Sequence, residues 1–94
     1  METYNELPMA TGKMLSSLEG KRMAVGARQL KKAVASGRAH QVFVARNADP
    51  AITEPILSLC IEHGAQCLWV KSMTELGKAC GIEVGATAAA AVDD

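Results

Sequence analysis

The chain has 94 residues, with ten Lys and Arg residues balanced by ten Asp and Glu residues and only three aromatic residues. This length suits one compact domain spanning residues 1–94, and the few aromatic side chains argue against stacking of nucleic-acid bases on the protein. No apolar run reaches the roughly 18 to 20 residues that span a bilayer, and the first residues lack the pattern of a secretory signal, so we expect a cytoplasmic protein without a membrane partner.

Helix and strand patterns alternate along the first half of the chain. We expect residues 1–10 to be loosely ordered. Apolar residues at helical spacing between Thr11 and Gly20 predict a short helix, and residues 23–25 predict a short strand. Beyond this strand, apolar residues recur at positions i, i+3, i+4 and i+7, which predicts an amphipathic helix over residues 27–37.

The alternation continues in the middle of the chain. Residues 41–46 are rich in β-branched and aromatic side chains, the composition of a strand, and residues 66–71 predict another strand. Between them, Pro55 is tolerated only in the first turn of a helix. We therefore expect a helix that begins near Thr53 and ends at Gly64.

Residues 72–92 contain the last expected helix and strand. Ser72 and Glu75 match a capping box, which predicts a helix running to about Cys80. In residues 86–92 alanine favours a helix, but the alternation of the chain favours a strand, in which small side chains let helices on both faces approach closely. Strands alternating with helices predict an α/β protein, a three-layer α/β/α sandwich with a four-stranded mixed sheet.

The charges are distributed unevenly along the chain. Residues 12–48 contain eight cations and one acid, a net charge of +7, whereas residues 49–94 have a net charge of −5. This separation indicates a face that attracts anions, although an ordinary solvated surface explains it equally well.

A polar surface is expected at the start of the helix over residues 27–37. At about 100° per residue, Arg28, Gln29 and Lys32 fall on one face, whereas Lys31 projects elsewhere. The unpaired amides of a helix N-terminus also favour anions. An amphipathic surface helix shows much of the same pattern, so the sequence leaves both anion binding and simple exposure open. The residues expected to face the core are Leu30, Ala33 and Val34.

A loop between two glycines is the second candidate surface. Gly81 and Gly85 enclose the aliphatic residues Ile82 and Val84. Such a loop packs its aliphatic side chains either against the protein's own core or against a partner. Both interpretations stay open, and the second includes a protein-interaction module that docks a partner protein through this loop.

We expect no enzyme, no cofactor and no metal site. Cys60, His63 and Cys67 have the spacing C-x2-H-x3-C, but they offer three ligands where structural zinc sites use four, and His63 falls on the apolar face of its helix. Cys60 and Cys80 lie toward helix C-terminal ends, where a nucleophilic thiolate is not stabilised. The cysteines are odd in number and lie among apolar residues, which favours reduced, buried thiols.

Four segments together carry a family resemblance: GARQLKK at residues 26–32, ADP at 48–50, ELGKACGIEVGA at 75–86 and the alanine-rich end of the chain. With these segments, the chain resembles the kink-turn RNA-binding ribosomal proteins of the large-subunit seven-A and thirty-E type, and most closely their small bacterial relatives. The resemblance implies an α/β/α sandwich that binds RNA containing a kink-turn, a bulge followed by tandem sheared G·A pairs. Ribosomal RNA is one possible target, and we expect the free protein to be a monomer.

The resemblance also implies which residues contact the RNA. Arg28 and Gln29 are suited to donate to guanine edges, and Lys32 to guanine or phosphate. The loop between the two glycines would lie against the unstacked nucleotides of the bulge. The expected RNA-contacting residues are Lys13, Gly26, Ala27, Arg28, Gln29, Lys32, Lys78, Ile82, Glu83, Val84 and Gly85.

Overall fold

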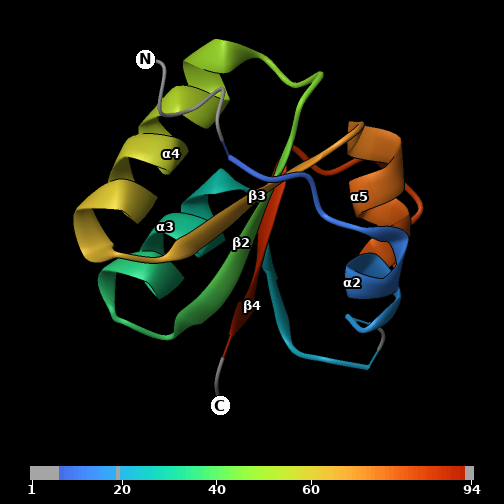
Figure 1. Cartoon of the computed structure of the whole chain (residues 1–94), viewed down its shortest axis with the longest axis horizontal. Coiled ribbons are helices and arrows are strands. Elements are labelled where there is room, and N and C mark those ends of the chain that lie inside the picture. Colours follow the sequence, from blue (N-terminus) through green and yellow to red (C-terminus); the bar gives the residue numbers. More distant parts are fainter. Residues whose placement is uncertain (1–6, 19, 93–94) are drawn as a thin grey trace.

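The computed structural model describes residues 7–18 and 20–92, and these residues form an α/β/α sandwich (Figure 1). Within them, four strands form one mixed sheet with helices on both faces, so the expected architecture is confirmed. The elements, in chain order, are α2 (Gly12–Ser16), β1 (Met23–Val25), α3 (Ala27–Ala35), β2 (Ala39–Ala45), α4 (Pro50–His63), β3 (Gln66–Val70), α5 (Met73–Ala79) and β4 (Ala88–Val92).

The sheet has the strand order β1-β4-β2-β3. β4 is antiparallel to both of its neighbours, and β2 is parallel to β3. β1, β2 and β3 therefore run in the same direction and end at the same edge of the sheet, where β4 begins. We call this edge, marked by Val25, Ala45, Val70 and Ala88, the carboxyl edge.

Each face of the sheet carries its own core cluster. α3 and α4 pack on one face with Val42 and Val44, and α2 and α5 pack on the other face with Phe43. Because successive side chains of a strand point to opposite faces, β2 is buried on both sides along residues 42–45.

β4 is a central strand made almost wholly of alanine. Ala88 and Ala90 face the α3–α4 layer, and Ala89 and Ala91 face the α2–α5 layer. Methyl side chains keep this strand thin, so helices from both layers pack closely against it. The expectation of a strand rather than a helix is confirmed.

Two strands begin at residues other than the expected ones. β4 begins at Ala88 instead of residue 86, because the amide of Ala86 donates to the carbonyl oxygen of Met73 in α5, at 3.0 Å. β2 begins at Ala39 instead of residue 41, because Ala39 pairs with Val92 at the end of β4. Both shifts follow from long-range partners, which periodicity does not reveal.

The helix α4 begins at Pro50, not near Thr53 as expected. The Asp49 side chain caps it by accepting a hydrogen bond from the Ala51 amide at 3.0 Å, and Pro50 occupies the first turn, where a missing N–H costs little. Pro55 consequently lies inside the helix, on its exposed side. The free energy gained from the cap at Asp49 and from Pro50 in the first turn outweighs the loss of the one intrahelical hydrogen bond that Pro55 cannot form.

The apolar face of α4 also differs from the expected one. His63 is exposed, so placing it on the apolar face was wrong. It stands at the end of the last turn, beyond the core. The residues that α4 buries are Thr53, Ile56, Leu57 and Cys60.

A short extended segment before α2 lies along the outer side of β3. The backbone of Trp69 exchanges hydrogen bonds with Pro8 and Ala10, at 2.9 and 2.7 Å. Backbone groups at the outer edge of β3 thus find partners in this segment. Residues 1–6 lie outside the described part of the chain.

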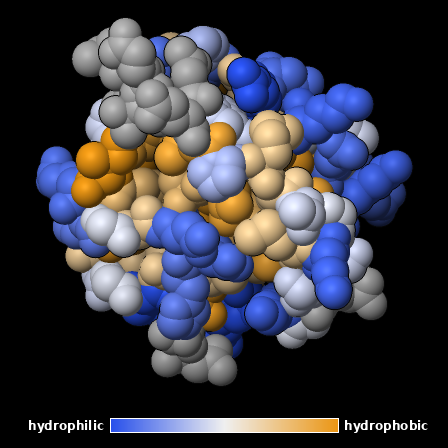
Figure 2. All heavy atoms as spheres, in the orientation of Figure 1, coloured by the Kyte–Doolittle hydropathy of each residue, from blue (hydrophilic) through white to orange (hydrophobic). Residues whose placement is uncertain are grey.

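The surface facing the viewer in Figure 1 is partly apolar. Figure 2 shows hydrophobic side chains reaching the surface across the middle of this face, with hydrophilic residues around them. Across the described ranges, no helix is both long and apolar enough to cross a membrane. The large hydrophobic side chains that are most exposed are Met9, Ile52, Ile61 and Val84.

Gly77 of α5 provides a test of how tightly the fold packs around the loop that follows this helix. A methyl group on Gly77 would overlap the carbonyl oxygen of Val84 and would lie 3.1 Å from the Cα atom of Gly85. We expect Gly77→Ala to lower the free energy of unfolding by about 1–3 kcal/mol, the usual cost of overpacking, although alanine is the better helix former. Denaturant unfolding measures this change.

Gly12→Ala in α2 is the matched control, because its added methyl group meets no atom within 4 Å. We expect the control to be as stable as the parent protein or slightly more stable. If Gly77→Ala were equally harmless, the close packing of α5 against its loop would be refuted.

Candidate nucleic-acid interface

β1 passes into α3 through the single residue Gly26. Its backbone angles, φ 91° and ψ 154°, lie in a region that is essentially restricted to glycine. Because this turn needs no further residue, α3 begins directly at the carboxyl edge. No side chain caps the first turn of α3, so the backbone N–H groups of that turn are available to an anion.

α3 has the polar face that the sequence predicts. Arg28, Gln29 and Lys32 are exposed, and they belong to the first two turns of the helix. Two cations and an amide donor thus accompany a helix N-terminus, and both features favour negative charge. The expected core residues of this helix are confirmed as buried, and they are Leu30, Ala33 and Val34.

The loop of residues 81–87 is fixed by the way α5 ends. The amide of Gly81, at φ 77°, donates to the Lys78 carbonyl oxygen, and the amide of Ile82 donates to the Gly77 carbonyl oxygen, each at 3.0 Å. These are the paired hydrogen bonds of a Schellman motif. Ile82 is half-buried and packs against the α2–α5 core cluster, so for Ile82 the interpretation as cover for the protein's own core is correct.

Val84 behaves differently from Ile82. Its side chain is 71% exposed, and the neighbouring Glu83 and Gly85 are also exposed. The loop backbone lies close against α5, because an added Cβ atom on Gly85 would stand only 3.1 Å from that of Met73. The loop therefore offers one aliphatic side chain to solvent from a backbone that the helix holds in place.

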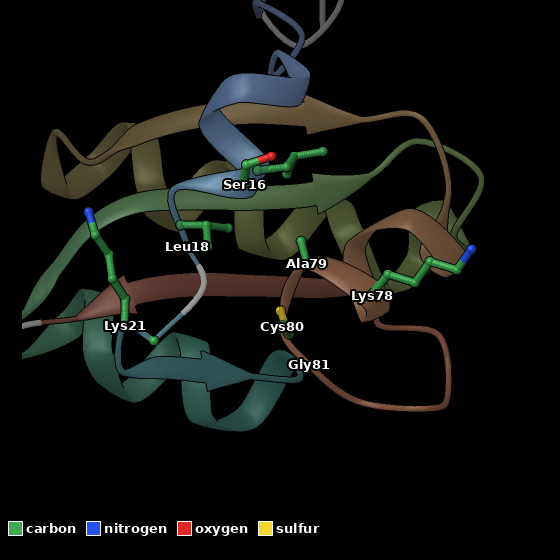
Figure 3. A pocket seen from close by; sticks show the side chains of 9 residues that line it. Ser16, Leu18, Lys21, Lys78, Ala79, Cys80 and Gly81 are labelled. Atoms are coloured by element: carbon green, nitrogen blue, oxygen red, sulfur yellow. The ribbon is translucent and has the colours of Figure 1, made fainter.

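The tip of α3 and this loop lie side by side. The amide of Gly26 donates to the carbonyl oxygen of Ala88 at 2.9 Å, and Ala88 is the residue into which the loop leads. Figure 3 shows the loop after Gly81 passing just beyond the end of β1, where α3 begins. The two surfaces expected from separate parts of the sequence thus meet at the carboxyl edge.

Two further lysines were expected at the interface, and the structure places them differently. Lys78 belongs to α5, and its side chain extends toward the carboxyl edge in Figure 3. Lys13 belongs to α2, whose residues pack on the face of the sheet opposite α3. Lys78 therefore adjoins the loop, whereas Lys13 lies in a different layer from the α3 surface.

Sequence reasoning missed two cations that stand at the same edge. Arg46 directly follows β2, Lys71 directly follows β3, and both are exposed. The guanidinium of Arg46 lies 5.7 Å from the centre of the Trp69 ring, which limits its freedom. The sequence did contain a signal for these two cations. The expected strands 41–46 and 66–71 end at Arg46 and Lys71, and the carboxyl ends of neighbouring parallel strands lie at the same edge of a sheet.

The uneven charge along the chain does not produce one uniformly positive face. Lys21 precedes β1 and Arg38 precedes β2, so both belong to the end of the sheet opposite the carboxyl edge. Figure 3 shows Lys21 and Lys78 pointing toward opposite ends of the molecule. Successive strands and helices bring the chain to both ends of the sheet in turn. The cations of residues 12–48 are therefore distributed over both ends of the molecule.

A cavity of about 500 Å³ opens between the C-terminal ends of α2 and α5 (Figure 3). Leu18, Ala79 and Cys80 contribute to its lining. Burial raises the pKa of the Cys80 thiol, which argues against a nucleophile there. In the part of the chain that the structure describes, no group of three or more His, Cys, Asp or Glu residues is arranged to hold a metal ion.

Known proteins have similar sequences. An RNA-binding protein from Bacillus pumilus is 43% identical over 72 residues, which cover 77% of this chain and 88% of that protein. The large ribosomal subunit protein eL8 from Halobacterium salinarum is 40% identical over 68 residues, which cover 71% of this chain and 57% of that protein.

Known structures share the fold. A 15.5 kD RNA-binding protein from Giardia lamblia superimposes with a TM-score of 0.76 and 26% identity, over 93% of this chain and 80% of that protein. The model of the ribosomal protein L7Ae/L30e/S12e/Gadd45 family matches residues 10–94, which is nearly the whole chain. The chain therefore belongs to the ribosomal protein L7Ae/L30e/S12e/Gadd45 family.

Proposed function

We propose that this protein binds structured RNA containing a kink-turn and stabilises the bent form, without catalysing a reaction. The observation that carries the proposal is the hydrogen bond between Gly26 and Ala88, which joins the tip of α3 to the start of β4. Relatives named as RNA-binding proteins support an RNA ligand. Family membership and the joined surfaces together make RNA the best-supported partner.

The chemistry of a kink-turn matches the polar face of α3. The major groove of regular RNA helices is too deep and narrow for side chains, but a sharp bend opens it, and sheared G·A pairs leave the O6 and N7 acceptors of guanine unpaired. The guanidinium of Arg28 and the amide of Gln29 are donors for these acceptors. Gly26 lets the RNA come close to the backbone amides because it carries no side chain.

The loop supplies the second half of the proposed contact. Val84 is exposed on a fixed backbone, and we assign it to the face of an unstacked nucleotide in the bulge. Glu83 is assigned to a base amino group, because a carboxylate near phosphates is otherwise unfavourable. Ile82 supports the loop from beneath by packing on the core.

Phosphate groups would be held by the cations around the carboxyl edge. Lys32 and Lys78 adjoin the helix tip and the loop, and Arg46 and Lys71 are two further cations along the edge. Lys13, in the α2 layer, would be reached only by RNA that continues past α5. We therefore assign Lys13 a smaller contribution than Lys32.

The alternative of a protein-docking module has less support. It requires both aliphatic residues of the loop to face a partner, but Ile82 packs on the protein's own core and only Val84 is exposed. One exposed valine is a small apolar surface for a protein partner.

Removal of the base-reading donors is the first test. We expect Arg28→Ala and Gln29→Ala each to weaken binding to a kink-turn duplex by about 1–3 kcal/mol, the usual scale of a specific base contact. Lys31→Ala is the matched control, because Lys31 is an exposed cation on the same helix but projects away from the proposed face. Titration by fluorescence anisotropy measures all three, and a larger effect of Lys31→Ala would refute the proposed orientation of α3.

Selectivity for the bend is the second test. We expect the protein to bind a duplex with tandem G·A pairs and to bring its two arms together, as measured by fluorescence energy transfer between labels on the arms. The same duplex with Watson–Crick pairs in place of the G·A pairs should remain straight and bind only as non-specific RNA. Equal affinity for the two duplexes would show that the protein binds RNA but does not recognise the kink-turn.

Salt dependence is the third test. With about three or four phosphates neutralised, the logarithm of the binding constant should fall against the logarithm of the salt concentration with a slope of roughly −2 to −4. Arg46→Ala should make this slope less negative by up to about 1 and should weaken binding to all RNA sequences alike. A slope near zero for the parent protein would argue against phosphate contacts at the carboxyl edge.

A further inference from the structure

Two buried cysteine side chains lie in contact at the end of the molecule away from the carboxyl edge. Cys60 is in the last turn of α4, Cys67 is near the start of β3, and their thiols lie close enough to shift each other's pKa. Both belong to the same core cluster, with 0% and 6% of their surface exposed. Neither residue belongs to the proposed RNA interface.

The path of the chain brings the two thiols together. α4 ends at Gly64, and the amide of Ala65 then donates to the Cys60 carbonyl oxygen at 2.9 Å, so the chain reverses at once. β3 begins at Gln66, which places Cys67 beside the last turn of α4. The contact between the two thiols therefore joins α4 to β3, and these two elements already pack together in the core.

The third cysteine is separated from this pair. Cys80 is half-buried and packs with the α2–α5 cluster, on the other face of the sheet from Cys60 and Cys67. A disulfide requires sulfur atoms about 2.05 Å apart and Cβ atoms about 3.5–4.5 Å apart. Only the Cys60 and Cys67 pair meets on one face of the sheet.

We propose that Cys60 and Cys67 are an oxidative modification site, at which a peroxide converts the two thiols into an intramolecular disulfide that fastens α4 to β3. The two thiols interact so closely that each shifts the pKa of the other. The first proton is therefore lost from the pair, and either sulfur can carry the resulting thiolate.

The reaction consumes one hydrogen peroxide for each disulfide. The thiolate of the pair attacks a peroxide oxygen, the O–O bond breaks, and its sulfur becomes a sulfenic acid with release of water. The sulfur of the other cysteine then attacks the sulfenic sulfur, the S–S bond forms, the S–O bond breaks, and a second water leaves. Two thiols are oxidised and one peroxide is reduced to two waters. Since both thiols are buried, the peroxide enters when the last turn of α4 opens, and the reaction is slow.

The test uses the reduced full-length chain with Cys80→Ser, which removes the half-buried thiol and keeps the pair. After treatment with hydrogen peroxide, we expect the intact mass to fall by the mass of two hydrogen atoms and peptide mapping to link Cys60 to Cys67. The closed loop should raise the midpoint of thermal unfolding by about 5–15 °C, and a reductant should reverse both changes. Peptide mapping of the unsubstituted chain should find the same link.

Cys67→Ala is the matched control, since Cys60 then has no partner and should stop at sulfenic acid or its further oxidation products. Separate oxidation of Cys60 and Cys67 in the parent chain, covalent dimers, or two thiols that stay reduced near the unfolding midpoint would each overturn the proposal. None of these measurements involves RNA, so the result is independent of the proposed RNA-binding function.

Discussion

The hydrogen bond between Gly26 and Ala88 determines where the candidate interface lies. It joins the end of an outer strand to the start of the central strand β4, at the point where α3 leaves the sheet and the loop after α5 enters it. Only a residue with the backbone freedom of glycine makes this turn without a longer connection. A longer connection would move the α3 tip away from Val84 and separate the proposed base-reading donors from the apolar contact.

The alanines of β4 contribute to the same arrangement from inside the molecule. α3 and α5 lie on opposite faces of the sheet, yet the helix tip and the loop that follows α5 meet at one edge. A thin central strand keeps the two layers close, whereas larger side chains in β4 would push them apart. Gly77 has a similar effect on the loop, because it lets the Val84 backbone lie against α5. The small residues that allow close packing in the core therefore also keep the helix tip and the loop close together at the candidate interface.

Local patterns predicted most of the fold and of the α3 surface. The buried residues of α3 follow directly from helical spacing, and the strand at the end of the chain followed from the alternation of elements even though its alanines favour a helix. The start of α4 was missed because the cap formed by Asp49 competes with Pro55, and periodicity does not weigh these two effects. Arg46 and Lys71 were missed because they approach the interface only through the parallel pairing of β2 and β3.

The short segment along β3 affects how the molecule behaves at high concentration. An open sheet edge is a template on which another chain can add a strand, and such additions can lead to aggregation. Met9 occupies the outer side of β3 at Trp69, and the opposite edge strand, β1, is only three residues long. In the described part of the chain, β1 is short and the outer side of β3 is occupied at Trp69, which limits the addition of a strand by another chain.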